Sequence, residues 1–120
     1  MGGLRVLVVD DNDLQREVLA DVLGSEGYDV RVAASGAEAL ASARTVPPDV
    51  VVLDLMLPDT DGATVLATLR REPSLSAMRV VVTTGVRSPS VRRLPGVDVA
   101  LFKPFELREL LDALESVRSR

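Results

Sequence analysis

The sequence predicts an α/β fold in which helices cover both faces of a doubly wound, five-stranded parallel sheet. The chain has 120 residues, which is the length of one domain with its own core, so we expect a single domain over residues 1–120. Five short runs rich in valine are typical of buried strands, and they lie at residues 6–9, 30–33, 50–53, 80–84 and 97–101. Helical patterns separate these runs. Strands that alternate with helices form parallel sheets through right-handed crossovers.

The first connection is predicted to be a helix because its apolar residues repeat with helical spacing. Leu14, Val18 and Leu23 belong to one apolar stripe of that helix. Asn12 precedes the stripe and is expected to cap the helix, because its side chain can accept hydrogen bonds from the free amides of the first turn. Gly27 ends the pattern, as glycine commonly does after a helix.

The second and third connections carry their own start and stop signals. Ser35, followed three residues later by Glu38, forms a capping box that opens a helix through Ala43. Two prolines then stop any continuation of that helix. A third helix is predicted over residues 62–72, and it ends just before Pro73.

The last two connections differ in length. Ser88 and Pro89 can start a fourth helix, but Pro95 and Gly96 stop it after about a turn and a half. The final helix is predicted over residues 105–117, where four leucines fall on one side. The fourth helix is therefore expected to be short.

The composition excludes several kinds of chemistry. With no cysteine and no histidine, the chain has no disulfide, no Cys/His zinc site, no imidazole base and no thiol nucleophile. The formal charge of −4 would repel a polyanion, so we expect no direct binding of nucleic acid. The apolar runs are far shorter than the ~20 residues of a membrane-spanning helix. We expect a soluble protein with no membrane partner, in the cytoplasm.

Polar side chains follow or end four of the five predicted strands. They are Asp10 and Asp11 after the first strand, Asp54 after the third, Thr83 and Thr84 at the end of the fourth, and Lys103 after the fifth. In an open parallel sheet the carboxyl ends of the strands meet at one edge, which is where ligands bind. The sequence therefore predicts that carboxylates, a hydroxyl and an ammonium group converge in one crevice.

Three carboxylates in one crevice require a cation or protons. Two carboxylates about 5 Å apart repel by about 3 kcal/mol at an effective dielectric constant near 20. A hard divalent ion such as Mg²⁺ is the expected cation, because it is held by one or two carboxylates while it contacts phosphate oxygens. Phosphoryl transfer is the implied chemistry, with one aspartate as nucleophile. Lys103 is the only lysine among 14 basic residues, and it falls at this site.

Four motifs carry a resemblance to a known family. They are the segments 7–12 (LVVDDN) and 54–62 (DLMLPDTDG), the pair Thr84-Gly85, and the run Lys103-Pro104-Phe105. In combination they resemble the receiver domain of two-component response regulators, and the similarity covers residues 5–117. The resemblance implies a flavodoxin-like sheet with the strand order 2-1-3-4-5.

The resemblance also implies a role for each site residue. Asp54 would be the phospho-acceptor, taking a phosphoryl group from a histidine of a sensor kinase or of a phosphotransfer protein. Asp11 and Asp54 would ligate Mg²⁺ directly, Asp10 would act largely through water, and the backbone carbonyl of Met56 would add a ligand. Thr84 would bond the phosphoryl group through its hydroxyl, and Lys103 would be the charge partner of that group.

Further features follow from the same resemblance. The bond between Lys103 and Pro104 is expected to be cis. Thr84 is preferred to Thr83 as the switch residue because Gly85 follows it, where relatives carry Ala or Gly. Gly62 is expected to serve the backbone geometry of a turn.

The chain departs from the family at two places. Relatives usually carry Tyr or Phe three residues before the lysine, where this chain has Ala100, so the usual coupling between the threonine and an aromatic ring is in doubt. Phe102 lies two residues further on the same strand face and is a candidate substitute. Beside the short fourth helix, Arg87, Arg92 and Arg93 form a basic cluster, which is either a solvated loop or a docking surface for an acidic partner.

Two apolar residues flank the path by which water would reach the phosphoryl group in relatives. They are Met56 and Val86, each two residues after a site residue. We therefore predict slow dephosphorylation in the absence of a phosphatase.

The predicted function is that of a signalling receiver rather than an enzyme, catalysing only its own phosphorylation and dephosphorylation. It would switch its affinity for an output protein, and a weak homodimer is among its expected associations. We expect no output module within the chain, which is either a stand-alone receiver or part of a longer regulator. The alternative is a receiver-like docking module that works without phosphorylation. A nucleotide-binding or hydrolytic enzyme is disfavoured, because the turn after the first strand is acidic where glycines would cradle a phosphate.

Overall fold

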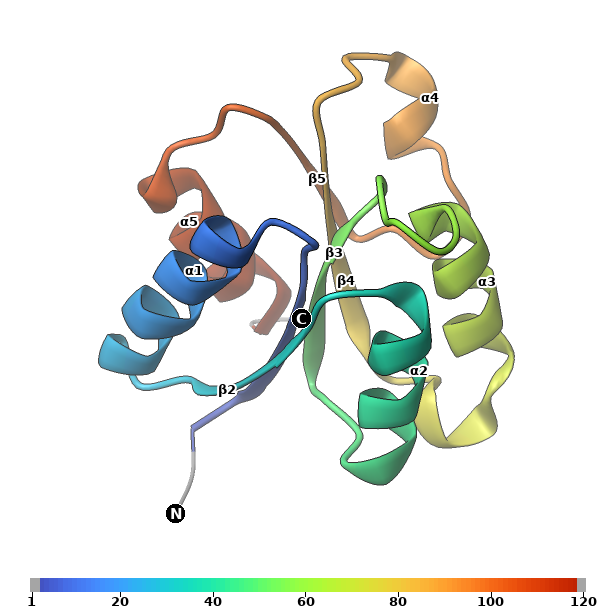
Figure 1. Cartoon of the computed structure of the whole chain (residues 1–120), viewed down its shortest axis with the longest axis horizontal. Helices are drawn as coiled ribbons and strands as arrows, with labels where there is room; N and C mark the ends of the chain where they lie inside the picture. The colour runs from blue at the N-terminus through green and yellow to red at the C-terminus, as the bar shows by residue number, and fades with distance from the viewer. Residues whose placement is uncertain (1–2, 119–120) are drawn as a thin grey trace.

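The computed structural model describes residues 3–118 and confirms the predicted α/β class (Figure 1). Residues 1, 2, 119 and 120 of the predicted domain lie outside this range. All neighbouring strands pair in parallel, in the order β2-β1-β3-β4-β5. The strands are β1 (Arg5–Val9), β2 (Asp29–Ala33), β3 (Val50–Asp54), β4 (Arg79–Thr84) and β5 (Val99–Phe102).

The helices lie where the sequence places them, and side chains cap several of them. They are α1 (Asp13–Ser25), α2 (Gly36–Thr45), α3 (Gly62–Arg71), α4 (Pro89–Arg92) and α5 (Leu107–Arg118), with a short 3₁₀ turn at Pro73–Leu75. Asn12 caps α1 as predicted, since its side chain accepts from the amide of Gln15 at 2.8 Å. Ser35 caps α2 through the amide of Glu38. Asp61 caps α3 through the amide of Thr64.

Two predicted elements begin two residues later than expected. The strand predicted over 97–101 is Val99–Phe102, because the carboxylate of Asp98 takes the amide of Val80 and the ladder begins one residue later. The helix predicted over 105–117 is Leu107–Arg118, because the amide of Glu106 donates to the side chain of Glu109, which places the first turn after Glu106. The fourth helix is short, as predicted: it has four residues and ends before Pro95.

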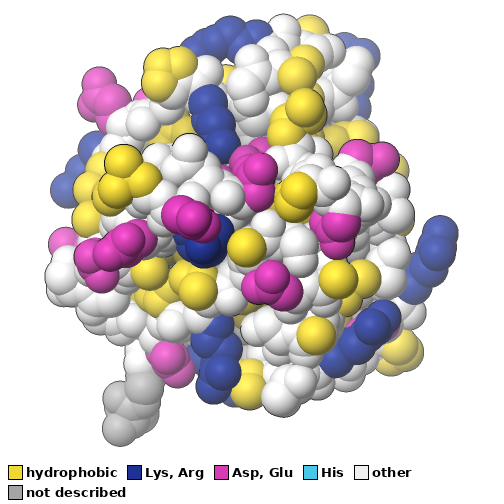
Figure 2. All heavy atoms as spheres, viewed as in Figure 1, with side chains coloured by type: hydrophobic (Ala, Val, Ile, Leu, Met, Phe, Trp, Pro, Cys, Tyr) yellow, Lys and Arg dark blue, Asp and Glu magenta, His cyan; other side chains and the backbone are white. Residues whose placement is uncertain are grey.

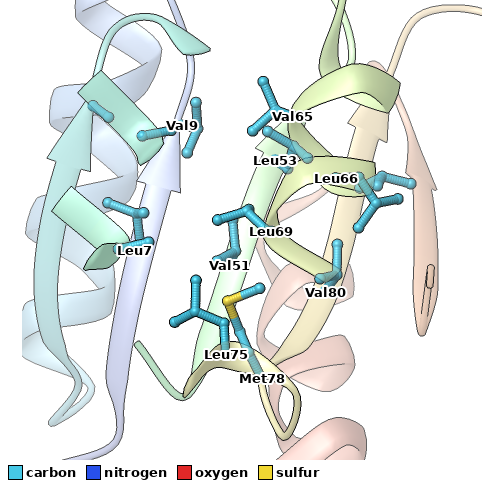
Figure 3. Packing of buried hydrophobic residues seen from close by; sticks show 14 of the residues in the cluster. Leu7, Val9, Val51, Leu53, Val65, Leu66, Leu69, Leu75, Met78 and Val80 are labelled. Carbon is cyan, nitrogen blue, oxygen red and sulfur yellow. The ribbon is translucent and has the colours of Figure 1, made fainter. Parts of the chain in front are cut away.

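The sheet separates two hydrophobic clusters, since successive side chains of a strand point to opposite faces. Helices α2 and α3 cover one face, and α1 and α5 cover the other (Figure 1). Figure 3 shows the first cluster, in which Val65, Leu66 and Leu69 of α3 lie against Leu53 and Val80 of the sheet. The second cluster joins valines of β1 and β3 to leucines of α1 and α5. Both sheet faces are thus closed by apolar packing, which leaves the edge of the sheet for polar chemistry.

The strand register determines which residues meet at that edge. Val9 pairs with Leu53, so the residues that follow them, Asp10 and Asp54, lie at the same level. Thr84 pairs with Phe102, which brings Lys103 one residue beyond the end of β5. None of the helices within residues 3–118 is long and apolar enough to cross a membrane.

We predict that the buried face of α3 contributes strongly to stability. Leu69 is fully buried, whereas Leu14 on α1 is 71% exposed. Leu69→Ala should lower the free energy of unfolding by about 2–5 kcal/mol, because it removes buried methyl groups and leaves a cavity. The matched change Leu14→Ala should alter it by less than about 0.5 kcal/mol. Urea denaturation of both variants measures the difference, and equal losses would contradict the packing described for α3.

Candidate functional site

The predicted site residues meet at the carboxyl edge of the sheet. Asp10 and Asp11 follow β1, Asp54 ends β3, and Lys103 follows β5. One carboxylate oxygen from each of the three aspartates lies within 4.8 Å of the others. Asp10 and Asp54 are each 3% exposed, while Asp11 faces solvent. The structure therefore brings together the three carboxylates that the sequence predicted to converge.

Lys103 supplies the positive charge within this cluster. Its Nζ lies 2.8 Å from Oδ2 of Asp54 and 3.5 Å from Oδ2 of Asp10. Burial by itself lowers the pKa of an ammonium group, but here the hydrogen bond and charge of Asp54, with the charge of Asp10, outweigh it. The pKa of Lys103 therefore lies above its ordinary value of 10.5, and the side chain carries its charge at neutral pH.

Backbone amides hold the two buried carboxylates in place. The amide of Asn12 donates to Oδ1 of Asp10 at 2.9 Å, and the amide of Met56 donates to Oδ1 of Asp54 at the same distance. Each of these aspartates thus has one oxygen on a backbone amide and the other facing the ammonium of Lys103. A carboxylate held in this way presents one defined oxygen to a reacting group.

The two threonines of β4 occupy different positions at the edge. Thr83 pairs in register with Asp54, whereas Thr84 is the last residue of the strand. Both are buried. The hydroxyl oxygen of Thr84 accepts from the amide of Val86 at 3.1 Å, and the carbonyl of Thr84 accepts from the amide of Lys103 at 2.8 Å. Thr84 is therefore tied to the loop after β4 and to the residue that carries the ammonium.

The loop between β3 and α3 is closed tightly around Gly62. A Cβ at this position would come within 2.6 Å of the Cα of Leu55 and within 2.7 Å of the carbonyl oxygen of Asp54. Only glycine allows this approach, as expected from the sequence. An antiparallel bridge between Met56 and Asp61 closes the loop, and the bond between Lys103 and Pro104 is cis, as predicted.

Asp59 is a residue of this loop whose role was not foreseen. Its two carboxylate oxygens accept from the amides of Gly36 and Ala37, at 2.8 and 3.0 Å. These amides open α2, so Asp59 joins the β3–α3 loop to the start of a second helix. Hydrogen bonds from Gly36 and then Ala37 hold the pKa of Asp59 below its ordinary value of 3.8. No local sequence signal could show this contact, because 23 residues separate Asp59 from Gly36.

Arg16 is a second supporting residue that sequence reasoning missed. Its guanidinium donates to the carbonyl oxygen of Asp10 at 2.8 Å and pairs with Asp13 at 2.6 Å. It therefore braces the turn that carries Asp10 and Asp11 from the first turn of α1. Its position four residues after Asn12, near the start of the predicted helix, is the signal that could have suggested the contact.

Two residues of β5 lie where the sequence departs from the family pattern. Ala100 and Phe102 lie partly buried against the cluster on the α2 and α3 side. Phe102 pairs in register with Thr84, and its ring lies beneath the guanidinium groups of Arg87 and Arg92. The aromatic ring nearest the end of β5 is thus Phe102, which lies beside α4.

The donor set of the edge fits a hard divalent cation. Three carboxylates face one another across less than 5 Å, and oxygen ligands of this kind suit Mg²⁺. Asp11, which makes no hydrogen bond or ion pair among residues 3–118, leaves its carboxylate available to an ion. Lys103 offsets only part of the negative charge of the three carboxylates, and the rest favours a bound cation.

Comparison with known proteins agrees with this geometry. The family model of the response regulator receiver domain matches residues 6–115. The protein TcrX of Mycobacterium tuberculosis is 38% identical over 116 residues, covering 96% of this chain and 50% of TcrX. The DNA-binding response regulator MtrA of Mycolicibacterium smegmatis is 36% identical over 107 residues, covering 89% of this chain and 47% of MtrA. The chain thus spans about half the length of these relatives.

Solved structures match over nearly the whole chain. The chemotaxis response regulator CheY4 of Vibrio cholerae superposes with a TM-score of 0.90 at 30% identity, covering 96% of this chain and 98% of CheY4. A response regulator receiver domain protein from Methanospirillum hungatei gives a TM-score of 0.90 at 29% identity, covering 98% of this chain and 96% of that protein.

We predict that Asp59 stabilises the loop next to the site in a pH-dependent manner. Asp59→Asn should lower the melting temperature at pH 7, because it removes the negative charge of the carboxylate that accepts hydrogen bonds from two amides of α2. Since the folded pKa of Asp59 is depressed, this stabilisation is present above about pH 3.8 and is lost as the pH falls through the lower folded value.

Thermal unfolding of the parent and of Asp59→Asn between pH 7 and pH 2.5 tests this, with the exposed Asp21→Asn as the matched control. The difference between Asp59→Asn and the parent should shrink in acid. A difference that stays constant across this range would show that the charge of Asp59 is not involved.

Proposed function

This chain belongs to the response regulator receiver domain family, and we propose that it is a phosphorylation switch whose acceptor is Asp54. The observation that carries the proposal is the placement of Asp54. Its Oδ2 lies 2.8 Å from Nζ of Lys103, within a cluster of three carboxylates at the edge of the sheet. A cluster of mutually repelling acids has no use in packing, whereas it suits a phosphoryl group and the cation that accompanies it.

In the proposed reaction, an oxygen of Asp54 attacks the phosphorus atom of a phosphohistidine on a sensor kinase or a phosphotransfer protein. The new O–P bond forms as the P–N bond breaks, and the electron pair leaves with the imidazole of the partner. Lys103 is placed to offset the negative charge on the phosphoryl oxygens, and the Thr84 hydroxyl is proposed to donate to one of them. The chain would catalyse only this transfer and its own dephosphorylation.

Mg²⁺ is the proposed cofactor. Asp11 and Asp54 would bind it directly, Asp10 largely through water, and the carbonyl of Met56 would complete the protein's share of ligands. When bound, the ion neutralises charge on the transferred group. The Asn12 and Met56 amides fix the orientation of the Asp10 and Asp54 carboxylates, which belong to this proposed ligand set.

Phosphorylation would change which anionic groups face the ammonium group of Lys103. In the unphosphorylated chain the ammonium group contacts the carboxylates of both Asp54 and Asp10. An acyl phosphate on Asp54 would offer it new anionic oxygens. Since the amide of Lys103 donates to the Thr84 carbonyl, and Phe102 pairs with Thr84, a shift at the site would reach the ends of β4 and β5. We propose that this shift changes affinity for an output element.

The formal charge of the chain bears on the kind of partner that the proposed switch would contact. MtrA, about half of which this chain covers, is named a DNA-binding regulator. We propose that this domain itself contacts protein rather than DNA, because its formal charge is −4, and that any DNA binding belongs to another part or partner. A cytoplasmic location and a weak homodimer are compatible with this role.

We predict that incubation with acetyl phosphate and Mg²⁺ adds a single phosphoryl group. Intact-mass spectrometry should show a gain of about 80 Da on the parent chain. Asp54→Asn should show no gain, because the nucleophile is gone. The exposed Asp21→Asn serves as the matched control and should be modified like the parent, and a chelator should prevent the reaction.

The same experiment decides between the switch and a docking module that works without phosphorylation. A parent chain that gains no mass with either acetyl phosphate or a phosphorylated histidine partner would contradict the switch. The docking module would then be favoured by Ala100, which replaces the usual aromatic residue, and by the four-residue α4.

We predict that phospho-Asp54 is long-lived. Met56 and Val86 each follow a site residue by two positions and are 65% and 54% exposed, so neither offers a polar side chain to an approaching water. The double variant Met56→Asn/Val86→Glu should hydrolyse its phospho-Asp54 roughly tenfold faster than the parent, because polar side chains can position the attacking water. Loss of the phosphoryl group after rapid removal of the donor measures this rate. A parent lifetime of seconds that the double change leaves unaltered would contradict the prediction.

A further inference from the structure

A cavity of about 370 Å³ lies at the amino edge of the sheet, where β1, β3 and β4 begin. We call it the amino-edge cavity. Residues at the starts of these strands line it, together with the turn before β4 and the end of α5. Its volume falls within the roughly 300–1,000 Å³ of sites that bind small molecules. The carboxylates and Lys103 lie at the opposite edge, so the proposed phosphorylation makes no use of this cavity.

Three arginines line the amino-edge cavity. Arg5 is the first residue of β1, Arg79 is the first residue of β4, and Arg118 is the last residue of α5. Their side chains are between 40% and 48% exposed, and the ion pair of each with a carboxylate is 3.7–4.0 Å long. These separations exceed the about 2.7–3.2 Å of a hydrogen bond, so an anion within that distance would bind the guanidinium groups more closely. Figure 2 shows basic side chains on the lower part of the molecule, the end at which β1 and β3 begin in Figure 1.

Asp49 holds two of these arginines in position through the backbone. Its amide donates to the carbonyl oxygen of Arg5 at 2.9 Å, and its own carbonyl oxygen accepts from the amide of Arg79 at 2.9 Å. The amide of Arg5 donates to Oδ2 of Asp49 at 2.8 Å. These backbone groups at the strand starts are thus already used, so a ligand would meet the arginine side chains. The lining residues include three arginines and, as their one acid, Asp49, so together they carry a net charge of +2.

The rest of the lining is mostly apolar. Leu75, Met78 and Val117 are at most 3% exposed, and they form part of the wall of the cavity. Pro47 and Pro48 add two rings, and neither has an amide N–H to offer a ligand. A wall of this kind favours a flat hydrophobic group, because binding removes the surface of that group from water. The cavity therefore combines guanidinium donors with an apolar wall for a ring.

We propose that the amino-edge cavity binds a small phosphate monoester that carries an aromatic ring, with its phosphate on the arginines and its ring against the apolar wall. A phosphate monoester carries about −1.5 to −2 charges near neutral pH, which matches the charge of the lining residues. Guanidinium groups also suit it, because they donate two parallel hydrogen bonds to phosphate oxygens. A nucleic acid fits less well, because the formal charge of −4 repels an extended row of phosphates. The inference goes beyond the proposed phosphorylation of Asp54 and does not depend on it.

The test uses adenosine monophosphate as the probe, and the amide chemical shifts of the isotope-labelled chain locate its binding. EDTA in the buffer keeps divalent ions away from the carboxylates at the other edge. The amides of Arg5, Asp49 and Arg79 should shift and saturate as the probe is added, whereas those of Met56 and Lys103 should not move. Inorganic phosphate and adenosine each carry one half of the probe, so each should bind at least about tenfold more weakly.

Variants of the arginines test which side chains hold the phosphate. R5Q/R79Q should bind adenosine monophosphate at least about tenfold more weakly than the parent, because two forked donors are removed. The matched control is R31Q/R93Q, which removes two exposed arginines that do not line the cavity. It makes the same change in net charge and should alter binding by less than about twofold, because salt screens distant surface charges. R118Q leaves the strands untouched and should weaken binding at least about threefold, which gives a second test if R5Q/R79Q fails to fold.

Several outcomes would overturn the proposal. The absence of any shift at millimolar probe, or shifts confined to the carboxyl edge of the sheet, would show that the cavity takes no such ligand. Equal losses of affinity in R5Q/R79Q and R31Q/R93Q would mean that net charge alone attracts the phosphate. Inorganic phosphate that binds as tightly as the probe would exclude a role for the ring, and adenosine that does so would exclude a role for the phosphate. Tighter binding of a single-stranded oligonucleotide, lost in R5Q/R79Q, would assign the cavity to nucleic acid.

A further arm separates this inference from the proposed function. Asp54→Asn cannot accept a phosphoryl group, but its amino-edge cavity is intact, so it should bind adenosine monophosphate as the parent does. Loss of binding in Asp54→Asn would contradict the independence of the two sites. Failure of the mass-gain experiment with retained binding of the probe would overturn only the phosphorylation switch.

Discussion

The contact on which the rest of the site depends is the one between Lys103 and the two buried aspartates. Asp10 and Asp54 are almost fully removed from solvent, and an unpaired charge in such a place would be strongly destabilising. Nζ of Lys103 lies within 3.5 Å of both. This contact joins segments that are 49 and 93 residues apart, so it forms only when the whole sheet is assembled. The folded state and the reactive geometry therefore have a common requirement.

The sheet explains why the polar chemistry is confined to one edge. Along β1, β3 and β4 nearly every side chain is buried in one of the two apolar clusters, so neither face can hold charged groups. At the carboxyl ends the strands stop and the loops turn away, which leaves room for side chains and for backbone amides that point inward. Gly62 and Asp59 hold the β3–α3 loop close to the sheet, through close backbone approach and through bonds to α2. The sheet thus provides a rigid base for the site, and the loops above the sheet shape it.

The two departures from the family pattern lie on the same side of the molecule. Ala100 carries a small side chain on β5, and all residues of that strand but Leu101 are only partly buried, beside the four-residue α4. Phe102 is partly buried there, and the guanidinium groups of two arginines stack on its ring. Because Phe102 precedes Lys103 directly and pairs with Thr84, the ring that carries the two arginines is joined to the charged cluster through one short stretch of backbone. The chain thus departs from the family pattern at Ala100 and at α4, while it keeps the motif residues at the edge of the sheet.

The sequence alone determined the α/β class, the strands within two residues at either end, the caps at Asn12 and Ser35, and the convergence of Asp10, Asp11, Asp54 and Lys103. These follow from local periodicity and from the rule that parallel strands end at one edge. The tertiary structure alone decided the ion pairs of Lys103, the contacts of Asp59 and Arg16, the later start of β5 at Val99, and the stacking of Arg87 and Arg92 on Phe102. Each of these depends on distances between side chains and on backbone amides freed or taken by a distant segment. The amino-acid sequence shows which groups end at the edge of the sheet. The distances between those groups are set only when the sheet and its loops pack together.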